Sequence, residues 1–288
     1  MSKKPLVIYH GNCADGFTAA WCFWKKYGDT FEYYPGRHQT PPPDVSGRDV
    51  YLVDFSYKRP VVEGMLAVCH KLTLIDHHKS ALEDLNLLGD DHSNYACFCS
   101  LDKSGARLAW EYVFGAEPPP YVLLHVEAKD LWRHLPGSRE IGAVIFSYEY
   151  TFDNWNTLMA IKDVDGVSDI LKEGVAIERK QHKDVAEIVK LAETGMFIGG
   201  HYVPVVNVPY TYGSDAGNLL CQDKPFAAYY YISKDGVDFG LRSSEKGLDV
   251  SAIAVLYGGG GHPHASGFRV SHEKFWQMFN DRGWAGGI

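Results

Sequence analysis

In the first half of the chain, short apolar runs alternate with longer stretches of mixed polar and apolar residues. Three of these runs end at Tyr9, Val53 and Ile75, and a histidine or an aspartate follows each one. Short continuous apolar runs are typical of strands buried on both faces of a parallel sheet. Their alternation with helices predicts a doubly wound α/β domain over residues 1–150. We expect strands at 5–9, 30–34, 49–53 and 71–75 and helices at 17–27, 60–69, 107–114 and 121–131. Residues 84–102 are expected to be loop-rich.

The pattern changes after residue 150. Residues 151–193 favour helices, and 167–191 mix Ile, Val and Ala with charged residues at helical spacing, which predicts an amphipathic helical linker. Residues 195–208 and 226–241 are β-rich, with a turn at Asp235-Gly236, and 250–257 predicts a short helix. We therefore expect a smaller α/β domain over residues 194–288.

The composition limits which classes of binding partner are expected. The chain has 288 residues and a net charge of −8, which argues against strong non-specific binding to long nucleic acid. It does not argue against a small anionic substrate, because bound metal ions can reverse the local field. No apolar run is long enough to span a bilayer, and residues 1–5 lead into a strand, so we expect a cytoplasmic protein without membrane contact. A homodimer is left open.

The six cysteines show no paired framework and are expected to be reduced. Cys97 and Cys99 lack the spacing of a structural zinc site, so we do not expect one there.

The segment Asp76-His77-His78 delivers a carboxylate and two imidazoles at the predicted end of a strand. In open α/β sheets, ligands bind at the carboxyl ends of the strands. Consecutive residues of an extended chain point to opposite sides, so the three cannot all bind one metal ion. They can divide between one metal, a neighbouring metal or a supporting contact, and a substrate phosphate. The alternative is a surface turn with solvated histidines.

Further carboxylates and imidazoles occur at other predicted strand and helix ends, namely His10, Asp15, Asp54 and Asp130. For Asp130, a surface ion pair with Arg133 is the alternative. Oxygen and imidazole ligands suit Mn²⁺ or Mg²⁺, with Co²⁺ and Fe²⁺ also possible. The set exceeds the needs of one metal, and two ions about 3.5–4 Å apart clamp a phosphate and generate hydroxide. The residues therefore favour phosphate-ester hydrolysis.

A run of four glycines, Gly258–Gly261, precedes His262. Each glycine costs roughly 0.5–1 kcal/mol of ordering relative to alanine, so helix or strand propensity does not explain the run. It predicts a backbone that approaches a ligand, with N–H groups arranged to bind an anion. A flexible hinge is the alternative. Ser104 and Gly105, at the start of a predicted helix, are weaker phosphate candidates, since an ordinary capped helix has the same sequence pattern.

These motifs resemble those of the DHH phosphoesterase superfamily, which takes its name from the motif that Asp76-His77-His78 matches. Gly259–Gly261 with His262 resembles the signature of the associated C-terminal substrate-binding domain, DHHA1. His10 with Asp15, then Asp54 and Asp130, resemble the other metal motifs in their expected order. Over residues 5–270 the chain is most similar to the branch of oligoribonucleases (nano-RNases) and 3′-phosphoadenosine-5′-phosphate phosphatases, because it holds only the two core domains.

The resemblance implies roles for individual residues. Asp54 would bridge two divalent ions, His78 would contact the scissile phosphate and assist the leaving oxygen, and Asp76 would support the motif. One ion would be held by His10 and Asp54, the other by Asp15, Asp54, His77 and Asp130. The far phosphate or base would be held by Arg242, Gly259, Gly260, Gly261 and His262.

The resemblance also implies a function: a metal-dependent phosphodiesterase that releases 5′-mononucleotides from short oligoribonucleotides in a cleft between the domains. A 3′-phosphoadenosine-5′-phosphate phosphatase and a phosphodiesterase of linear or cyclic dinucleotides remain alternatives. A nucleotide-binding regulator without catalysis is an alternative of another class.

The first motif departs from the family pattern. Cys13 stands where the first of two aspartates usually falls, and its spacing from His10 is one residue shorter than in many members. Cys13 is therefore either a thiolate ligand that favours a softer ion, or the mark of a poorer site that fills only with substrate.

Overall fold

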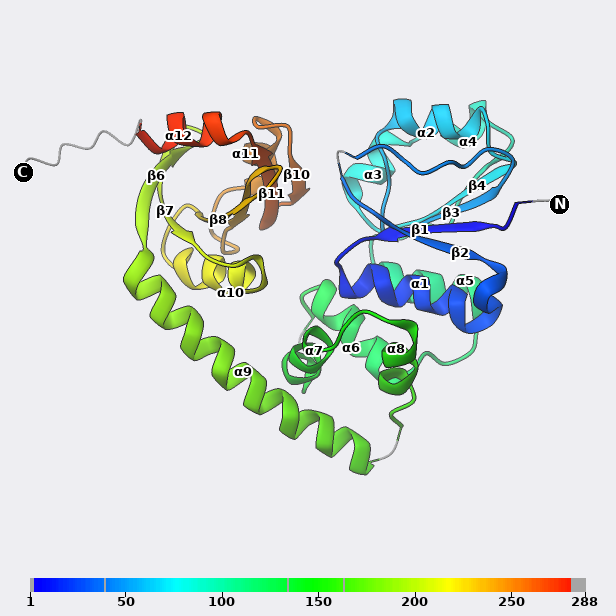
Figure 1. Cartoon of the computed structure of the whole chain (residues 1–288), viewed down its shortest axis with the longest axis horizontal. Helices are drawn as coiled ribbons and strands as arrows, with labels where there is room; N and C mark the ends of the chain where they lie inside the picture. Colours follow the sequence, from blue (N-terminus) through cyan, green and yellow to red (C-terminus); the bar gives the residue numbers. More distant parts are fainter. Residues whose placement is uncertain (1–2, 39, 134, 163, 281–288) are drawn as a thin grey trace, which may run out of the picture. The chain divides into compact units, whose positions relative to one another are not determined.

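The computed structural model describes residues 3–38, 40–133, 135–162 and 164–280. They fall into two compact units, Met1–Glu178 and Arg179–Ile288, called here the first and the second unit (Figure 1). The elements of the first unit are β1 (Leu6–His10), α1 (Ala14–Tyr27), the 3₁₀ helix η1 (Gly28–Thr30), β2 (Glu32–Gly36), β3 (Asp49–Val53), α2 (Arg59–Leu66), β4 (Lys71–Ile75), α3 (Lys79–Asp84), α4 (Leu88–Asp91), β5 (Tyr95–Cys97), α5 (Gly105–Phe114), α6 (Tyr121–Asp130), α7 (Ser138–Ser147) and α8 (Phe152–Met159).

The first unit is built on a parallel sheet with the strand order β2-β1-β3-β4-β5. Helices cover both faces, with α2, α3 and α4 on one side and α1 and α5 on the other (Figure 1). Successive strand residues enter opposite cores: Leu6 and Ile8 pack on one face and Val7 on the other. The predicted doubly wound sheet is confirmed. Its strand order reverses between β1 and β3, where such sheets bind ligands.

Helix α1 is fixed by aromatic contacts near its start. The Trp155 indole N–H donates to the Thr18 hydroxyl oxygen at 2.9 Å, and the Thr18 hydroxyl donates to the carbonyl of Ala14 at 2.7 Å. The rings of Phe17 and Trp155 meet edge to face with centroids 4.7 Å apart. All of these side chains except the half-buried Ala14 are buried, so the first turn of α1 has little freedom to move.

Residues 84–102 are mostly loop, as expected, and they also contain α4 and the short edge strand β5, which pairs with β4 through Leu74 opposite Cys97. The expectation for two cysteines of this stretch was wrong. Cys97 and Cys99 form a disulfide, although all six cysteines were expected to be reduced. The pairing is geometrically possible because the two Cα atoms lie 5.7 Å apart, a separation that a disulfide spans.

The second unit is built on a six-stranded sheet with the order β10-β11-β9-β8-β7-β6, antiparallel except between β7 and β8. One core lies under α11 and α12, and a smaller one lies under α10 and the end of α9. The remaining elements are α9 (Val164–Ala192), β6 (Thr194–Ile198), β7 (His201–Asn207), α10 (Tyr210–Leu220), β8 (Ala227–Ser233), β9 (Gly236–Arg242), α11 (Val250–Val255), β10 (Gly260–His262), β11 (Ala265–Val270) and α12 (His272–Asn280).

The stretch 151–193, predicted as the linker, contains α8 and α9, and the units divide inside α9. The reason is that α9 contributes to two cores. Ile170 packs in the first unit, whereas Val185 and Val189 pack in the second. Within the described residues, no helix combines the length and the apolar character that crossing a bilayer requires.

The glycine-rich run is more regular than expected. Gly260–His262 forms β10, which pairs with β11 as an antiparallel hairpin. A Cβ at Gly259 would lie 2.6 Å from the Phe268 Cβ, and Gly261 has φ of +141°, so both positions require glycine for packing or conformation. The strand pairing therefore explains part of a run that strand propensity did not predict.

Candidate metal centre

The sheet of the first unit brings the predicted metal ligands to one edge. His10 ends β1, Asp54 follows β3, and His77 follows β4 by two residues. These three strands are neighbours and run in parallel, so their carboxyl ends lie side by side. Asp15 joins them from the first turn of α1, and Asp130 joins from the last residue of α6.

Asp54 lies at the centre of this group. Its Oδ1 is 3.1 Å from the His77 Nε2, and its Oδ2 is 3.4 Å from the His10 Nδ1. The residue has φ of +53°, a region that non-glycine residues rarely adopt, and its N–H donates to the carbonyl of Ile75 at 2.9 Å. Burial acts to raise the pKa of the Asp54 carboxyl, but its contacts with the His10 and His77 imidazoles outweigh it and hold that pKa well below its usual range.

Asp15 and Asp130 carry carboxylate oxygens that the protein leaves without hydrogen bonds. Asp15 Oδ1 accepts from the Ala106 N–H at 3.2 Å, whereas its Oδ2 is buried and unpaired. Asp130 Oδ2 lies 3.4 Å from the His77 Nε2 and is in no hydrogen bond. Burial and the charge of Asp54 raise the pKa of Asp15 well above its usual value and that of Asp130 to about 6. Crowded buried carboxylates of this kind favour a bound cation.

Asp76 organises the segment that follows β4. Its Oδ1 accepts from the backbone N–H groups of His77 at 2.7 Å and His78 at 3.2 Å, and it lies 2.7 Å from the His78 Nδ1. Burial acts to lower the pKa of the His78 imidazole, but the hydrogen bond with Asp76 outweighs it and raises that pKa to about 9. His78 is therefore a cation in the metal-free protein, suited to contact an anionic phosphate.

The donor set fits metal ions. Potential ligand atoms lie within 4.8 Å of one another in three overlapping groups. Asp54 belongs to two of them, and its second oxygen, Oδ2, is buried without a hydrogen bond. Divalent cations satisfy such orphaned oxygens, and carboxylate and imidazole donors are ligands for first-row divalent metals. The groups are His10 with Cys13 and Asp54, then Asp15 with His77 and Asp130, and finally Asp54 with Asp76, His77 and His78.

Ser104 and Gly105 border the cluster. The Ser104 hydroxyl oxygen caps α5 by accepting from the Arg107 N–H at 3.3 Å, so that N–H is already paired. A Cβ at Gly105 would overlap Asp54 and lie 2.9 Å from the Asp15 Oδ2. Gly105 therefore allows the start of α5 to touch the ligands. Its use in phosphate binding stays a prediction.

The predicted substrate residues of the second unit belong to a different sheet from this cluster. Arg242 packs over the Tyr229 ring, and its guanidinium donates to the Ser214 hydroxyl at 3.2 Å. His262 is exposed on β10, and the Ser266 hydroxyl donates to its carbonyl at 2.7 Å. Their roles, like those of Gly259–Gly261, stay predictions.

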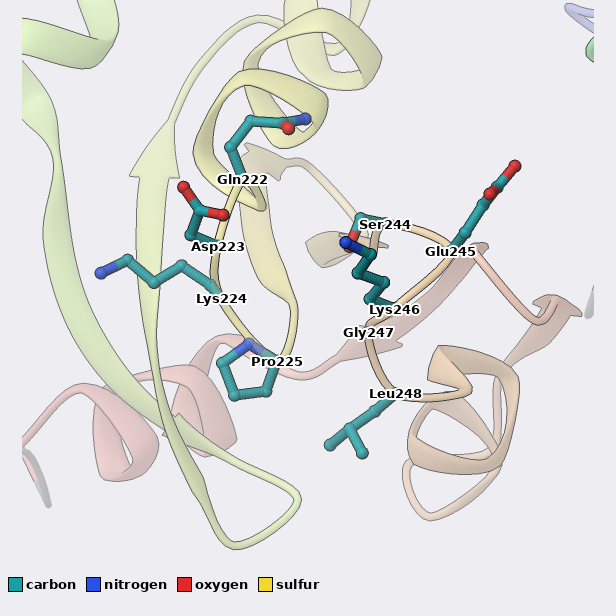
Figure 2. A pocket seen from close by; sticks show the side chains of 9 residues that line it. All are labelled: Gln222, Asp223, Lys224, Pro225, Ser244, Glu245, Lys246, Gly247 and Leu248. Carbon is teal, nitrogen blue, oxygen red and sulfur yellow. The ribbon is translucent and has the colours of Figure 1, made fainter.

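A pocket of about 690 Å³ in the second unit contains none of the predicted site residues. Figure 2 shows its two facing loops, residues 222–225 and 244–248. Its charged side chains are of both signs, Asp223 and Glu245 against Lys224 and Lys246, so it has no evident preference for an anion.

Two rings beside His10, those of His38 and Phe55, were not predicted from the sequence. The His38 ring lies 5.4 Å from the His10 ring and 4.9 Å from the Phe55 ring, measured between centroids. His38 lies just after the end of β2, and His10 lies at the end of β1. The position of His38 after a predicted strand was therefore the signal that could have identified it. His38 is exposed at the edge of the metal cluster.

No family model matches the chain. The chain is 32% identical over 298 aligned residues to the uncharacterized protein R106 of Acanthamoeba polyphaga mimivirus, an alignment that covers 94% of this chain and 69% of R106. It is also 36% identical to the oligoribonuclease NrnB of Bacillus subtilis (strain 168), but only over 34% of this chain and 24% of NrnB.

Two solved structures share the fold. The DHH domain of PF0399, a member of a family of ribosomal proteins, superposes with a TM-score of 0.60 at 13% identity, covering 96% of this chain and 85% of that one. PggH, a pGpG-specific phosphodiesterase from Vibrio cholerae, superposes with a TM-score of 0.52 at 15% identity, covering 97% of both chains. The chain therefore belongs to the same family as R106, and it has the fold of the DHH domain of PF0399.

Proposed function

We propose that this protein is a metal-dependent phosphodiesterase that cleaves short oligoribonucleotides to 5′-mononucleotides. The observation that carries the proposal is the position of Asp54, whose carboxylate faces His10 on one side and His77 on the other. A carboxylate placed in this way can bridge two cations, as phosphodiester hydrolysis by a two-metal site requires. The partial relationship to NrnB, named an oligoribonuclease, supports this substrate class.

Divalent cations, of which Mn²⁺ is our first choice, would supply Lewis acidity and an activated water at this site. The side chains of the protein would bind and orient the substrate. His78 would donate a hydrogen bond to the phosphate or the leaving oxygen. Asp76 orients the His78 ring through the 2.7 Å contact with Nδ1. We further propose that Arg242 and the segment Gly259–His262 bind the remote phosphate or base.

A substrate panel tests the proposal. Purified protein with Mn²⁺ or Mg²⁺ is given a dinucleotide, a pentanucleotide, a 24-residue RNA, 3′-phosphoadenosine 5′-phosphate and cyclic dinucleotides, and the products are separated by chromatography. We expect 5′-mononucleotides from the two short RNAs and little from the long one. Asp54→Asn should reduce the rate at least about a hundredfold, because a bound metal stabilises the transition state by several kcal/mol.

Asp49→Asn is the matched control, since Asp49 begins the same strand, β3, and contacts the exposed His70. It should leave the rate unchanged. Full activity of Asp54→Asn, or equal cleavage of the long RNA, would contradict the proposal.

A phosphodiesterase of linear dinucleotides is the second candidate. PggH, which shares the fold, is named a pGpG-specific phosphodiesterase, so pGpG belongs in the panel. Cleavage of pGpG alone among the short substrates would favour this candidate over the first.

A further inference from the structure

The metal centre contains one sulfur atom, that of Cys13. A ring nitrogen of His10, the Cys13 sulfur and an Asp54 oxygen all lie within 4.8 Å of one another. Cys13 directly precedes α1, where a side chain often caps the helix, yet its side chain makes no capping hydrogen bond. The Cys13 sulfur thus lies beside both a histidine and an aspartate of the metal cluster.

A second observation points to a ligand at the same place. The Asp54 Oδ2, on the side of His10, is buried without a hydrogen bond, and Asp54 is only 1% exposed. Buried carboxylate oxygens are rarely left unpaired unless an ion or water satisfies them. This oxygen lies 3.4 Å from the Nδ1 of His10, the histidine that is grouped with Cys13.

The loop before α1 explains how a shortened motif still reaches the site. Asn12 adopts φ of +63°, and the N–H of Gly11 donates to the carbonyl of Gly36 at 2.9 Å, which ties the loop to β2. A Cβ at Gly16 would lie 2.6 Å from the His10 Cβ, so the first turn of α1 packs directly on the end of β1. The first turn of α1 thereby stays close to His10, at the end of β1.

The two sides of Asp54 therefore offer different donors. On the far side, Asp15, His77 and Asp130 provide only carboxylate oxygen and imidazole nitrogen. We infer that Cys13 makes the His10–Cys13–Asp54 position selective for a borderline-soft divalent cation of the class of Co²⁺, Zn²⁺ and Fe²⁺, while the position of Asp15, His77 and Asp130 accepts Mn²⁺ or Mg²⁺. Thiolate selects softer ions, whereas carboxylate suits Mg²⁺ and Mn²⁺. On binding, the thiol proton is released to solvent and the sulfur electron pair forms the metal bond.

This inference rests on the proposed metal centre but not on its substrate, so cobalt spectroscopy tests it independently of catalysis. Metal-free protein is titrated with Co²⁺ under argon, and the near-ultraviolet band of thiolate-to-cobalt charge transfer is followed. We expect one such band in the natural protein and its loss in Cys13→Ser and Cys13→Asp. Cys22→Ala is the matched control, because Cys22 lies buried on the adjacent helix α1 and outside the ligand groups. It should retain the band.

Ion competition gives the second readout. Protein equilibrated with equal concentrations of Co²⁺ and Mn²⁺ is freed of excess ion, and its metal content is measured. The Co²⁺ to Mn²⁺ ratio should fall in Cys13→Asp, which replaces sulfur with carboxylate. Circular dichroism establishes that each variant is folded.

Absence of the band in the natural protein, a band that persists in both Cys13 variants, or an unchanged ion ratio would overturn the inference. If the band behaves as expected but no substrate of the panel is cleaved, the proposed function fails and the ion preference stands.

Discussion

Asp54 and the glycine that faces it control the metal centre at the scale of single residues. Asp54 holds a left-handed backbone conformation, a strain that generally persists only where the surroundings enforce it and that is common at functional sites. Gly105 is part of those surroundings, since a Cβ there would lie 2.8 Å from the Asp54 Oδ1. The position of the Asp54 carboxylate thus depends on the absence of a side chain at residue 105.

Gly105→Ala should therefore weaken metal binding without removing any ligand. The added methyl group must displace Asp54 or Asp15, and small displacements of ligands or their supports typically cost 10–100-fold in metal affinity. We expect a loss of about that size in calorimetric titration with Mn²⁺. Gly64→Ala provides the control, because Gly64 is exposed on α2 with no atom within 4 Å of a new Cβ. Equal affinities in the two variants would show that α5 can move away.

The convergence of the candidate ligands was predictable from sequence, whereas their conformations were not. His10, Asp54 and His77 follow apolar runs, and the ends of neighbouring parallel strands meet at one edge, so their convergence follows from strand order. The positive φ of Asp54 and the role of Gly105 depend on the packing of α5 against β3 and β4, which no local pattern encodes.

At the scale of secondary-structure elements, strands in short or glycine-rich segments could not be predicted from the sequence. β5 has three residues, too few for a hydrophobic period, and β10 consists of Gly260, Gly261 and His262. Both strands exist because a longer neighbour, β4 or β11, provides hydrogen-bonding partners. By contrast, β3 and β4 have the predicted bounds, since their own apolar residues specify them.

The contact between α7 and α9 gives a test at this scale. Gly174 is buried in α9, and a Cβ there would lie 2.5 Å from the carbonyl carbon of Glu140 in α7. Alanine raises helix propensity by about 1 kcal/mol over glycine, but overpacking against backbone typically costs 1–3 kcal/mol. We expect Gly174→Ala to lower the free energy of unfolding of the first unit in urea denaturation. Gly64→Ala should raise it slightly, and a stabilised Gly174→Ala would disprove the tight contact.

At the scale of the whole molecule, the two units differ in their candidate metal ligands. Every member of the metal cluster lies in the first unit. A ligand that binds only the folded state stabilises it, by about 2.7 kcal/mol at a hundred times its dissociation constant. In hydrogen exchange, we expect Mn²⁺ to slow the amides of β1, β3 and β4 and to leave those of β8 and β9 unchanged. Equal protection of both sheets would place the ion, or its effect, elsewhere.

Helix α9 determines where the gene can be divided to express the two units as separate proteins. Its 29 residues supply Ile170 to one core and Val185 and Val189 to another. A first half that stops before α9 would lose the contact of Ile170 and expose the apolar surface beneath it, and a second half that starts at β6 would do the same for Val185 and Val189. Soluble separate halves are thus expected only from a cut within α9, close to Glu178 and Arg179, so that each product keeps the portion of the helix that covers its own core.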